Sequence, residues 1–291
     1  MISNCIICEY RIGKITSKVV ISPWIRKLGV KKRISNYLIC SNCDCGFFSY
    51  RYNEDEMQCI YEDYRGNHYV RVRNYWEPWY NKKYNSSHDK DSWVAMRVNS
   101  LTEFINKFEL KPSTVIDIGG DRGQYIPNLG QELSILIDKS GKKPVHGVES
   151  KFSLSEIDKS DLIILSHVLE HVANPVETMK ELFSYSNVLY IEVPYGVPAV
   201  SKKRVSRFRF YIKLFTTGFP MLWRIFSKPA TGRKSGTGIL VQSEHINFFN
   251  EKSIMFLAKI LDAEFELEVN EIATPDGNRA RVIQCLLFAR T

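Results

Sequence analysis

The sequence predicts an α/β protein, built on a doubly wound sheet that ends in an antiparallel hairpin and preceded by a small N-terminal metal-binding ribbon. Three observations predict this fold. From residue 114 onward, short apolar runs alternate with helical segments. A glycine-rich turn directly follows the first apolar run. Two Cys-x-x-Cys pairs lie within the first 45 residues.

The N-terminal cysteines predict a metal site. Two pairs, each separated by two residues, can supply four thiolates to one Zn²⁺ ion, and in a cytoplasmic protein spaced cysteines favour metal over disulfides. The pairs are Cys5 with Cys8 and Cys40 with Cys43. Cys45, which precedes a glycine, is an alternative ligand in place of Cys43 or Cys40.

The chain between the cysteine pairs predicts a β ribbon. Its apolar stretches, Val19–Ile21 and Tyr37–Ile39, are short. A module of this size has little core of its own, so a bound metal would supply much of its folding free energy. We therefore expect residues 1–50 to form a zinc-binding module with a structural metal.

The main sheet is predicted strand by strand. Residues 114–118 form the first strand, the glycine-rich turn 119–123 follows, and a helix is expected next. The later apolar runs predict strands at Leu133–Ile137, near Val148–Glu149, and at Asp161–Leu165, Val188–Val193, Phe265–Ile272 and Ala280–Phe288. Helices are expected up to Phe183 and over Ser253–Leu261, and the turn 275–278 joins the last two strands as a hairpin.

Charge is distributed unevenly along the chain. The net charge of the 291 residues is +8, yet residues 1–33 carry eight basic residues and one acidic residue, and residues 197–243 carry ten basic residues and no acidic residue. The remainder of the chain is therefore acidic. Local positive charge favours a specific anionic partner over general nucleic-acid binding. Without an apolar run that could span a bilayer or an evident secretory signal, we expect a cytoplasmic protein.

Three motifs together resemble the class I S-adenosylmethionine-dependent methyltransferases: residues 115–123, Asp138 and the stretch 161–175. The resemblance is greatest to a subgroup with an N-terminal zinc-binding module, which includes deoxysugar C-methyltransferases and relatives from surface-polysaccharide clusters. Residues 61–69, 77–80 and 243–250 are similar to that subgroup as well. The resemblance covers most of the chain except 197–240 and implies the Rossmann-like sheet of class I methyltransferases.

The resemblance implies the cofactor-binding residues. Those that would hold the methionine moiety of S-adenosylmethionine are Asp117, Gly119, Gly120 and Gly123. Asp121 stands where many members have glycine, and its carboxylate could bond the amino group of the cofactor or turn outward. Asp138 would accept the ribose hydroxyls, and Ser166 and His167 would approach the methionine end. His171 is expected to pack beneath the loop that carries His167.

The resemblance also places the catalytic residues. His245 is the candidate general base, and Glu244 would orient or tune it. Tyr195 stands at the position of a second family histidine, and Gln242 stands where the C-methyltransferases have tyrosine. These two differences favour O-methylation of a sugar hydroxyl, with C-methylation of a nucleotide-linked keto-deoxysugar as the alternative.

Two segments flank the predicted core, which consists of residues 106–196 and 244–291. The aromatic segment 51–105 would connect the modules and cover the cofactor or substrate, although packing between modules explains its aromatic residues equally well. The basic, aromatic insertion 197–243 predicts a lid, an anion contact or a peripheral contact with the inner face of the membrane.

The expected partner is a sugar nucleotide or a glycan acceptor, and we expect no nucleic acid to bind. The alternative from another class is a zinc-containing nucleic-acid-binding protein. Against that alternative, the zinc module has no recognisable groove-reading helix, and the basic insertion adjoins the candidate base.

Overall fold

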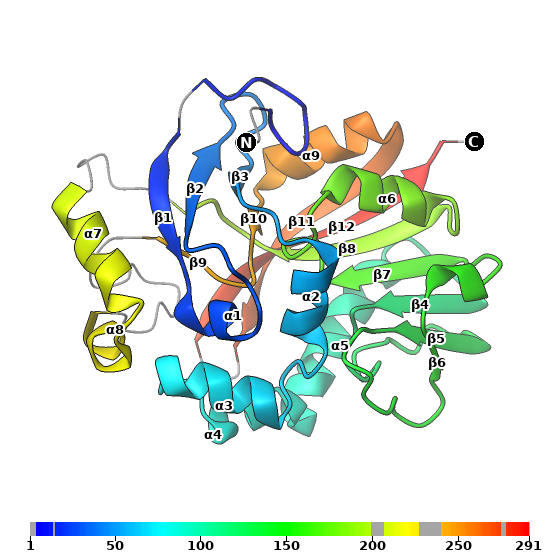
Figure 1. Ribbon diagram of the computed structural model, residues 1–291. Helices are drawn as coiled ribbons and strands as arrows, with labels where there is room; N and C mark the ends of the chain where they lie inside the picture. Colours follow the sequence, from blue (N-terminus) through cyan, green and yellow to red (C-terminus); the bar gives the residue numbers. More distant parts are fainter. Residues whose placement is uncertain (1–3, 14, 199–206, 227–239, 275–277, 291) are drawn as a thin grey trace.

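The computed structural model describes residues 4–13, 15–198, 207–226, 240–274 and 278–290. The described strands form two sheets, one of seven strands and one of five (Figure 1). The order of the larger sheet is β11-β12-β8-β7-β4-β5-β6. Its strands are β4 (Thr114–Ile118), β5 (Leu133–Ile137), β6 (Glu149–Lys151), β7 (Leu162–Ser166), β8 (Val188–Pro194), β11 (Ala263–Ala273) and β12 (Arg279–Ala289).

The strand directions confirm the mixed α/β sheet that the sequence predicts. Strands β4 to β8 run parallel, whereas β12 pairs antiparallel with β8 and β11 antiparallel with β12. Asp117 on β4 lies opposite Leu136 on β5 and Ile164 on β7. The carboxyl ends of β4, β5 and β7 therefore meet at one edge of the sheet, where ligands bind in folds of this kind.

Helices cover both faces of the larger sheet. On one face, α5 (Asp91–Asn106) packs Leu101 and Phe104 against Val115 and Ile164. On the other face, α6 (Pro175–Phe183) and α9 (Glu251–Ile260) pack against the alternate strand residues, such as Ile116. This alternation follows from the pleat of the strands, because successive side chains point to opposite faces.

Two local predictions in this sheet are wrong. The turn after β4 does not lead into a helix, because residues 119–132 are turns and irregular backbone. Positive φ angles at Asp121, Gly123 and Gly130, together with Pro127, are incompatible with a continuous helix there. The third strand, expected to end near Val148–Glu149, instead begins at Glu149.

The smaller sheet begins as the predicted N-terminal ribbon and is completed by distant residues. Its order is β10-β3-β2-β1-β9. The N-terminal strands are β1 (Ser17–Ile21), β2 (Ile34–Ile39) and β3 (Gly46–Phe48), and the distant ones are β9 (Val241–Gln242) and β10 (Asn247–Phe248). Strand β9 pairs with β1 and β10 pairs with β3. The N-terminal module therefore holds both ends of the segment 243–246, which contains Glu244 and His245.

Six further helices surround the smaller sheet in the described part of the chain: α1 (Pro23–Lys27), α2 (Glu54–Tyr61), α3 (Asn67–Trp76), α4 (Lys82–Ser86), α7 (Arg207–Thr216) and α8 (Pro220–Phe226). Short 3₁₀ turns lie at Ser87–Asp89 and Leu154–Glu156. Tyr69, Trp76 and Tyr80 from the aromatic segment are buried with Trp24 in one core, so packing accounts for these rings. No helix of the described residues is both long and apolar enough to cross a membrane.

Candidate active site

The turn after β4 requires glycine at several positions. Gly119 and Gly123 have φ angles of 71° and 73°, which favour glycine strongly. A Cβ atom at Gly120 would lie 1.8 Å from Oδ2 of Asp117, and one at Gly119 would lie 2.8 Å from Cγ2 of Val168. The turn therefore admits no side chain at these positions, and its backbone packs directly against Asp117 and Val168.

Asp117 lies buried beneath this turn. Burial raises the pKa of its carboxyl group to about 8, and the negative charge of Asp138 adds to that effect. In the ligand-free protein the Asp117 carboxyl is therefore mostly protonated at neutral pH. A cation placed beside it would favour its ionised form.

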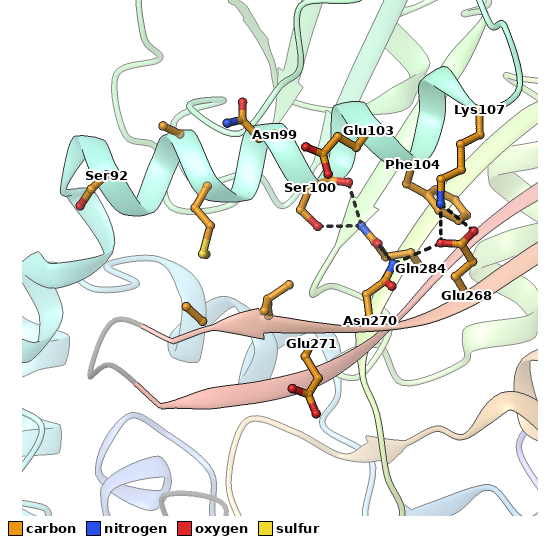
Figure 2. Close-up of a pocket in the computed structure, with 14 residues that line it drawn as sticks. Ser92, Asn99, Ser100, Glu103, Phe104, Lys107, Glu268, Asn270, Glu271 and Gln284 are labelled. Carbon is orange, nitrogen blue, oxygen red and sulfur yellow. Dashed lines mark hydrogen bonds and ion pairs between the residues drawn. The ribbon is translucent and has the colours of Figure 1, made fainter.

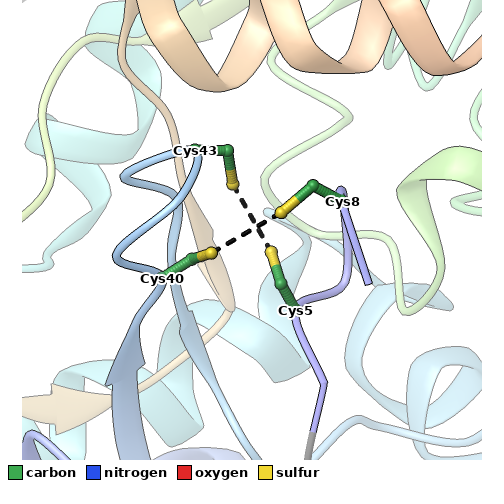
Figure 3. Close-up of side chains that lie close together, drawn as sticks. All are labelled: Cys5, Cys8, Cys40 and Cys43. Carbon is green, nitrogen blue, oxygen red and sulfur yellow. Dashed lines mark hydrogen bonds between the residues drawn. The ribbon is translucent and has the colours of Figure 1, made fainter. Parts of the chain in front are cut away.

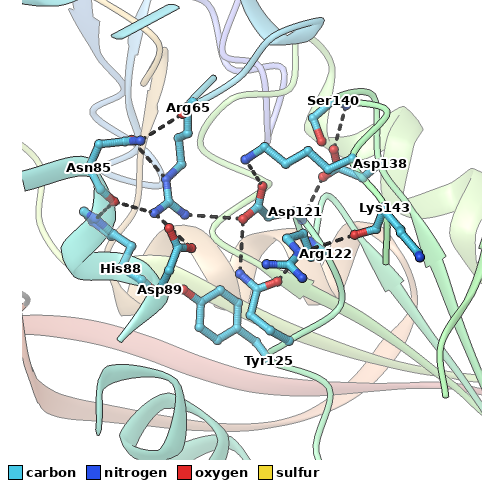
Figure 4. A network of polar contacts seen from close by, with 12 residues as sticks. Arg65, Asn85, His88, Asp89, Asp121, Arg122, Tyr125, Asp138, Ser140 and Lys143 are labelled. Atoms are coloured by element: carbon cyan, nitrogen blue, oxygen red, sulfur yellow. Dashed lines mark hydrogen bonds and ion pairs between the residues drawn. The ribbon is translucent and has the colours of Figure 1, made fainter. Parts of the chain in front are cut away.

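The Asp121 side chain belongs to a polar network rather than pointing into solvent (Figure 4). Its carboxylate accepts hydrogen bonds from Lys142 Nζ at 2.5 Å, Gln124 Nε2 at 3.1 Å and Arg65 Nη1 at 3.4 Å. Arg65 also donates to the backbone oxygen of Asn85 at 2.8 Å. The aromatic segment 51–105 is thereby bonded to the glycine turn.

Asp138 directly follows β5 and lies beside the same turn. Its Oδ2 atom accepts the backbone N–H of Asp121 at 2.9 Å, and its Oδ1 atom accepts that of Ser140 at 2.7 Å. Each carboxylate oxygen has a second lone pair, so Asp138 can still accept two hydroxyl donors. This arrangement suits a pair of neighbouring ribose hydroxyls.

A charged network lies where β7 and β8 end. Nδ1 of His167 is 3.2 Å from Oε1 of Glu170, and Nε2 is 3.2 Å from Oε1 of Glu192. Burial lowers the pKa of His167, but hydrogen bonds to the two carboxylates have a larger effect and raise it to about 9. Arg97 on α5 pairs with Glu192 and donates to Oγ of Ser166 at 2.7 Å. Ser166 and His167 are therefore both fixed by ionised neighbours.

Sequence reasoning missed Glu192 and Arg97. Burial raises the pKa of Glu192, but the Arg97 charge and the His167 hydrogen bond lower it to about 2. Glu192 is the one charged residue in the apolar run Val188–Pro194, which is a signal that could have found it. Arg97 lies among mixed residues of α5, where no comparable pattern marks it.

The structure brings His171 and His245 together. Their ring centroids are 4.7 Å apart, with the rings nearly perpendicular. Nδ1 of His171 lies 2.8 Å from the hydroxyl of Tyr61 and 3.1 Å from the backbone oxygen of Glu244. His171 was expected only to pack under its loop, but it occupies a turn that faces the candidate base. Glu170 lies close to both rings.

His245 is held in its neutral form. Burial lowers the pKa of His245 to about 4, and the neighbouring His171 adds to this effect. The negative charges of Glu170 and Glu244 oppose the lowering. A neutral imidazole offers a ring nitrogen with a lone pair at neutral pH, which is the form that can take a proton.

Glu244 does not orient His245 through a direct hydrogen bond. Oε1 of Glu244 accepts from Arg73 Nη1 at 2.9 Å, and Oε2 accepts from the hydroxyl of Tyr69 at 3.4 Å. Burial raises the pKa of Glu244, but the positive charge of Arg73 has a larger effect and lowers the pKa below its usual value. The carboxylate is therefore ionised. Glu244 thus anchors the segment to α3 and acts on His245 only through its charge.

Arg51 joins the two loops that carry the histidines. Its guanidinium donates to the backbone oxygens of Val172 at 2.7 Å, Ala173 at 3.0 Å and Ile246 at 3.1 Å, and to Oδ1 of Asn247 at 2.6 Å. Sequence reasoning did not single out this residue. It lies just after β3, at the start of the aromatic segment, so one half-buried side chain beside the N-terminal module reaches both loops.

Tyr195 follows β8 and lies beside the segment after His245. Its backbone forms a bridge with Phe249, and its ring is covered by the guanidinium of Arg281, at 4.0 Å from the centroid. Among the contacts of the described residues, none joins the Tyr195 ring to His245. The predicted catalytic role of Tyr195 stays a prediction.

Four cysteine thiols converge at the N-terminal module (Figure 3). Sγ of Cys5 is 3.5 Å from Sγ of Cys43, and Sγ of Cys8 is 3.6 Å from Sγ of Cys40. A tetrahedral zinc site with Zn–S bonds of about 2.3 Å has sulfur–sulfur separations of about 3.8 Å, so the four thiols suit such an ion. Cys45 lies outside this group, with its thiol against the backbone oxygen of Gly46.

The backbone of both cysteine turns also suits a metal site. The residue after each pair, Glu9 or Asp44, has a positive φ angle, 55° and 59° respectively. Backbone N–H groups point at two of the sulfurs: Ile7 donates to Cys5 and Asn42 donates to Cys40, each at 3.4 Å. Such donors stabilise a thiolate, which is the form that binds metal.

A cavity of about 630 Å³ lies between α5 and the β11–β12 hairpin (Figure 2). Its polar lining includes Asn99, Ser100, Asn270 and Gln284. Nε2 of Gln284 lies 3.2 Å from Oε2 of Glu192, so the cavity adjoins the charged network. None of the site residues predicted from the sequence lines this cavity.

Comparison with protein-family models gives a match over the centre of the chain. A family model described as a methyltransferase domain matches residues 91–264, which is more than half of the chain. No curated protein matches the chain.

Several solved structures are similar at low identity. The plantazolicin methyltransferase BamL, solved with a triazolic substrate analogue and SAH, is 13% identical over 76% of this chain and 95% of that chain, with a TM-score of 0.43. The N-terminal domain of EvdMO1, solved in the presence of SAH and D-fucose, is 12% identical over 67% and 83%, with a TM-score of 0.40. A SAM-dependent methyltransferase from Methanosarcina mazei is 18% identical over 65% and 98%, with a TM-score of 0.38. These TM-scores are too low to bear on the substrate.

Proposed function

We propose that this chain, which belongs to the methyltransferase domain family and is an S-adenosylmethionine-dependent methyltransferase, methylates a sugar hydroxyl. His245 would be the general base. The acceptor would be a sugar nucleotide or a glycan of surface-polysaccharide biosynthesis. The observation that carries this proposal is the contact of the neutral His245 ring with the His171 ring. The two histidines lie on different loops, which residues from other parts of the chain bring together.

The cofactor-binding edge is assigned by the fit of its residues. Bound S-adenosylmethionine supplies a methyl group on a positively charged sulfur. The turn of Gly119, Gly120 and Gly123 packs its backbone directly over Asp117, whose carboxyl a cation would ionise. Asp138 has acceptor capacity for two ribose hydroxyls.

The protein's part in the reaction would be to align the acceptor and remove its proton. A sugar hydroxyl has a high pKa, so a nearby base assists its attack. His245 would take that proton at a ring nitrogen, and the negative charges of Glu170 and Glu244 would stabilise the imidazolium that results. His171, fixed by Tyr61, would hold the His245 ring in place.

The sugar class of the acceptor rests on the resemblance of residues 61–69 and 243–250 to sugar methyltransferases. One observation supports C-methylation as the alternative. Gln242 is fully buried on β9, and its side chain donates to the backbone oxygen of Tyr50 at 2.9 Å. Because the Gln242 side chain is buried in the sheet, the replacement of tyrosine by glutamine at this position is a weaker argument for O-methylation than the sequence implies.

We also propose that Cys5, Cys8, Cys40 and Cys43 bind a structural Zn²⁺ ion. The sulfur separations and the N–H groups directed at two of the sulfurs support it. Because all four ligands come from the protein, such an ion would have no open position for a substrate. Its role would be to hold the first turn of the chain to the turn after β2.

Calorimetry and product analysis test the proposed function. Calorimetry should show that the full chain binds S-adenosylhomocysteine, and absence of binding would contradict the cofactor assignment. A panel of nucleotide-linked sugars, with and without a keto group, would then be incubated with labelled cofactor. NMR of the product reports whether the new methyl group is on oxygen, as proposed, or on carbon, which would establish the alternative.

The His245→Ala variant tests the base. Removal of a general base lowers the rate by about 10²–10⁴-fold, while cofactor affinity should stay unchanged. Ser243→Ala, which truncates a half-buried side chain on the same segment outside the histidine pair, serves as the matched comparison for local disturbance. Full activity of His245→Ala would remove His245 from the mechanism.

A further inference from the structure

Helices α7 and α8 carry large hydrophobic side chains that this chain leaves exposed. Both belong to the insertion that the resemblance does not cover. The exposed members, here called the hairpin patch, are Tyr211, Ile212, Phe215, Phe219, Met221 and Ile225. We propose that the hairpin patch, with Arg33 and the basic residues that precede it, is a docking surface for an anionic lipid bilayer.

The hairpin is anchored by its other face. Phe210 on α7 and Trp223 on α8 are buried in the core of the smaller sheet, and Nζ of Lys213 lies 4.1 Å from the centroid of the Trp223 ring. These contacts fix the orientation of both helices against β1 and α3. The patch residues on the opposite side therefore have a defined direction, and they point away from the body of the protein.

The patch spans both helices and is prominent. The ring centroids of Phe215 and Phe219 lie 4.7 Å apart, which joins α7 to the start of α8. Met221 is 76% exposed and Ile225 is 64% exposed. Figure 1 shows α7 and α8 at the outer edge of the molecule, on the side away from the larger sheet. A hydrophobic patch of this kind marks an interaction surface.

Positive charge from a distant part of the chain borders the patch. Nη2 of Arg33 lies 3.4 Å from Oγ1 of Thr217, at the C-terminal end of α7. Lys27, at the end of α1, and Lys31 and Lys32, on the loop before Arg33, are exposed. The sequence has no acidic residue in 10–43 or in 193–243, so the two basic segments that meet here contain no compensating carboxylate.

This combination fits a membrane surface better than a nucleic acid. Aliphatic side chains such as Ile212, Met221 and Ile225 cannot stack on bases, and nucleic-acid channels rely on aromatic stacking with cationic groups. Amphipathic elements at bilayers combine apolar side chains that enter the acyl boundary with basic residues that meet anionic headgroups. The occupant we assign is therefore a bilayer that contains anionic phospholipid.

Vesicle flotation with the full chain tests the proposal. We expect binding to vesicles of phosphatidylcholine with phosphatidylglycerol, weaker binding to phosphatidylcholine alone, and release by added salt. Phe215→Ser combined with Met221→Ser and Ile225→Ser should weaken binding by at least about tenfold. Lys27→Gln combined with Lys31→Gln and Lys32→Gln should weaken binding to the anionic vesicles by about tenfold or more.

The matched control is Met255→Ser with Ile260→Ser, which removes exposed hydrophobic side chains from α9. This control should bind vesicles like the unaltered protein, and all variants should keep their affinity for S-adenosylhomocysteine. The proposal is overturned if anionic vesicles do not bind, or if the hairpin variant binds as well as the α9 control. It is also overturned if the hairpin variant loses only self-association or oligonucleotide binding, since the patch would then serve a second copy or a nucleic acid.

Discussion

The two halves of the candidate active site are built in different ways. The cofactor half comes from the ends of three adjacent strands of one sheet, and its groups lie within residues 117–167. The acceptor half comes from three segments that are far apart in the sequence: residues 51–73, 167–173 and 243–247. The first half depends on local sequence, whereas the second depends on how the N-terminal module packs.

The hydrogen bonds show what this difference means for function. The backbone N–H groups of Ile246 and Asn247 both donate to the backbone oxygen of Glu170, at 2.8 and 3.0 Å. Arg51 spans the same two loops, and β9 and β10 hold the ends of the segment that contains His245. We therefore expect damage to the N-terminal module to impair turnover while leaving cofactor binding intact.

Arg51→Met is expected to give the largest difference between the two halves, with turnover impaired and cofactor affinity retained. This change leaves four backbone oxygens and the Asn247 side chain without their donor, at a cost of about 1–3 kcal/mol for each group that water does not reach. We expect turnover to fall by about 10²-fold, because small displacements of a catalytic group have effects of that size. Steady-state kinetics and calorimetry with S-adenosylhomocysteine measure the two halves separately.

Arg51→Lys is the matched control, since it keeps the charge and part of the hydrogen bonding and should retain more activity. A thermal melt would show that the Met variant is folded under the assay conditions. Equal loss of cofactor affinity and turnover in the folded Met variant would contradict the separation.

A change on the cofactor half should have the opposite effect. Asp138→Ala removes the carboxylate that accepts from the turn and from Ser140. We expect cofactor affinity to fall by about 10- to 100-fold, since hydrogen bonds to a charged group contribute about 1.5–3 kcal/mol each. Turnover at saturating cofactor should change less. Calorimetry and a rate measurement at high cofactor concentration check both, and a larger loss of turnover than of affinity would refute this assignment.

The smallest expected effect is on pH dependence. The pKa of Asp117 is about 8 in the free protein, because burial and Asp138 oppose its ionisation. A bound cation lowers that pKa, so binding releases a proton at pH values below about 8 and above the lowered pKa. Cofactor affinity should then rise with pH by up to about tenfold per unit and level off above pH 8.

Calorimetry in two buffers with different ionisation enthalpies measures this proton release. Asp117→Asn, which has no titrating carboxyl, should abolish the proton release. Proton uptake on binding, or the same release in the Asn variant, would exclude Asp117 as its source.

The two halves also differ in how well the sequence predicts them. The strands β4 and β5, the glycine turn and Asp138 follow from apolar runs and turn residues that are local in the sequence. By contrast, β9 and β10 are only two residues each and pair with strands about 200 residues away, so no periodic pattern could reveal them. That pairing, together with the backbone hydrogen bonds from Ile246 and Asn247 to Glu170, brings His245 next to His171.

Other differences have local physical causes. The helix expected after the glycine turn is absent because left-handed residues and Pro127 interrupt it. The resemblance assigned Glu244 to His245, but the carboxylate of Glu244 pairs with the buried Arg73 instead. Spacing alone left Cys45 open as a ligand, and only the fold separates it from the four converging thiols.

Metal removal tests most directly whether the N-terminal module controls only the acceptor half. The full chain would be treated with a zinc chelator while released metal, methyl transfer and S-adenosylhomocysteine affinity are measured on the same sample. The account predicts release of one zinc ion per chain and a fall in turnover of at least about 10²-fold, with cofactor affinity unchanged. Undiminished turnover after complete metal release, or parallel loss of turnover and cofactor affinity, would contradict it.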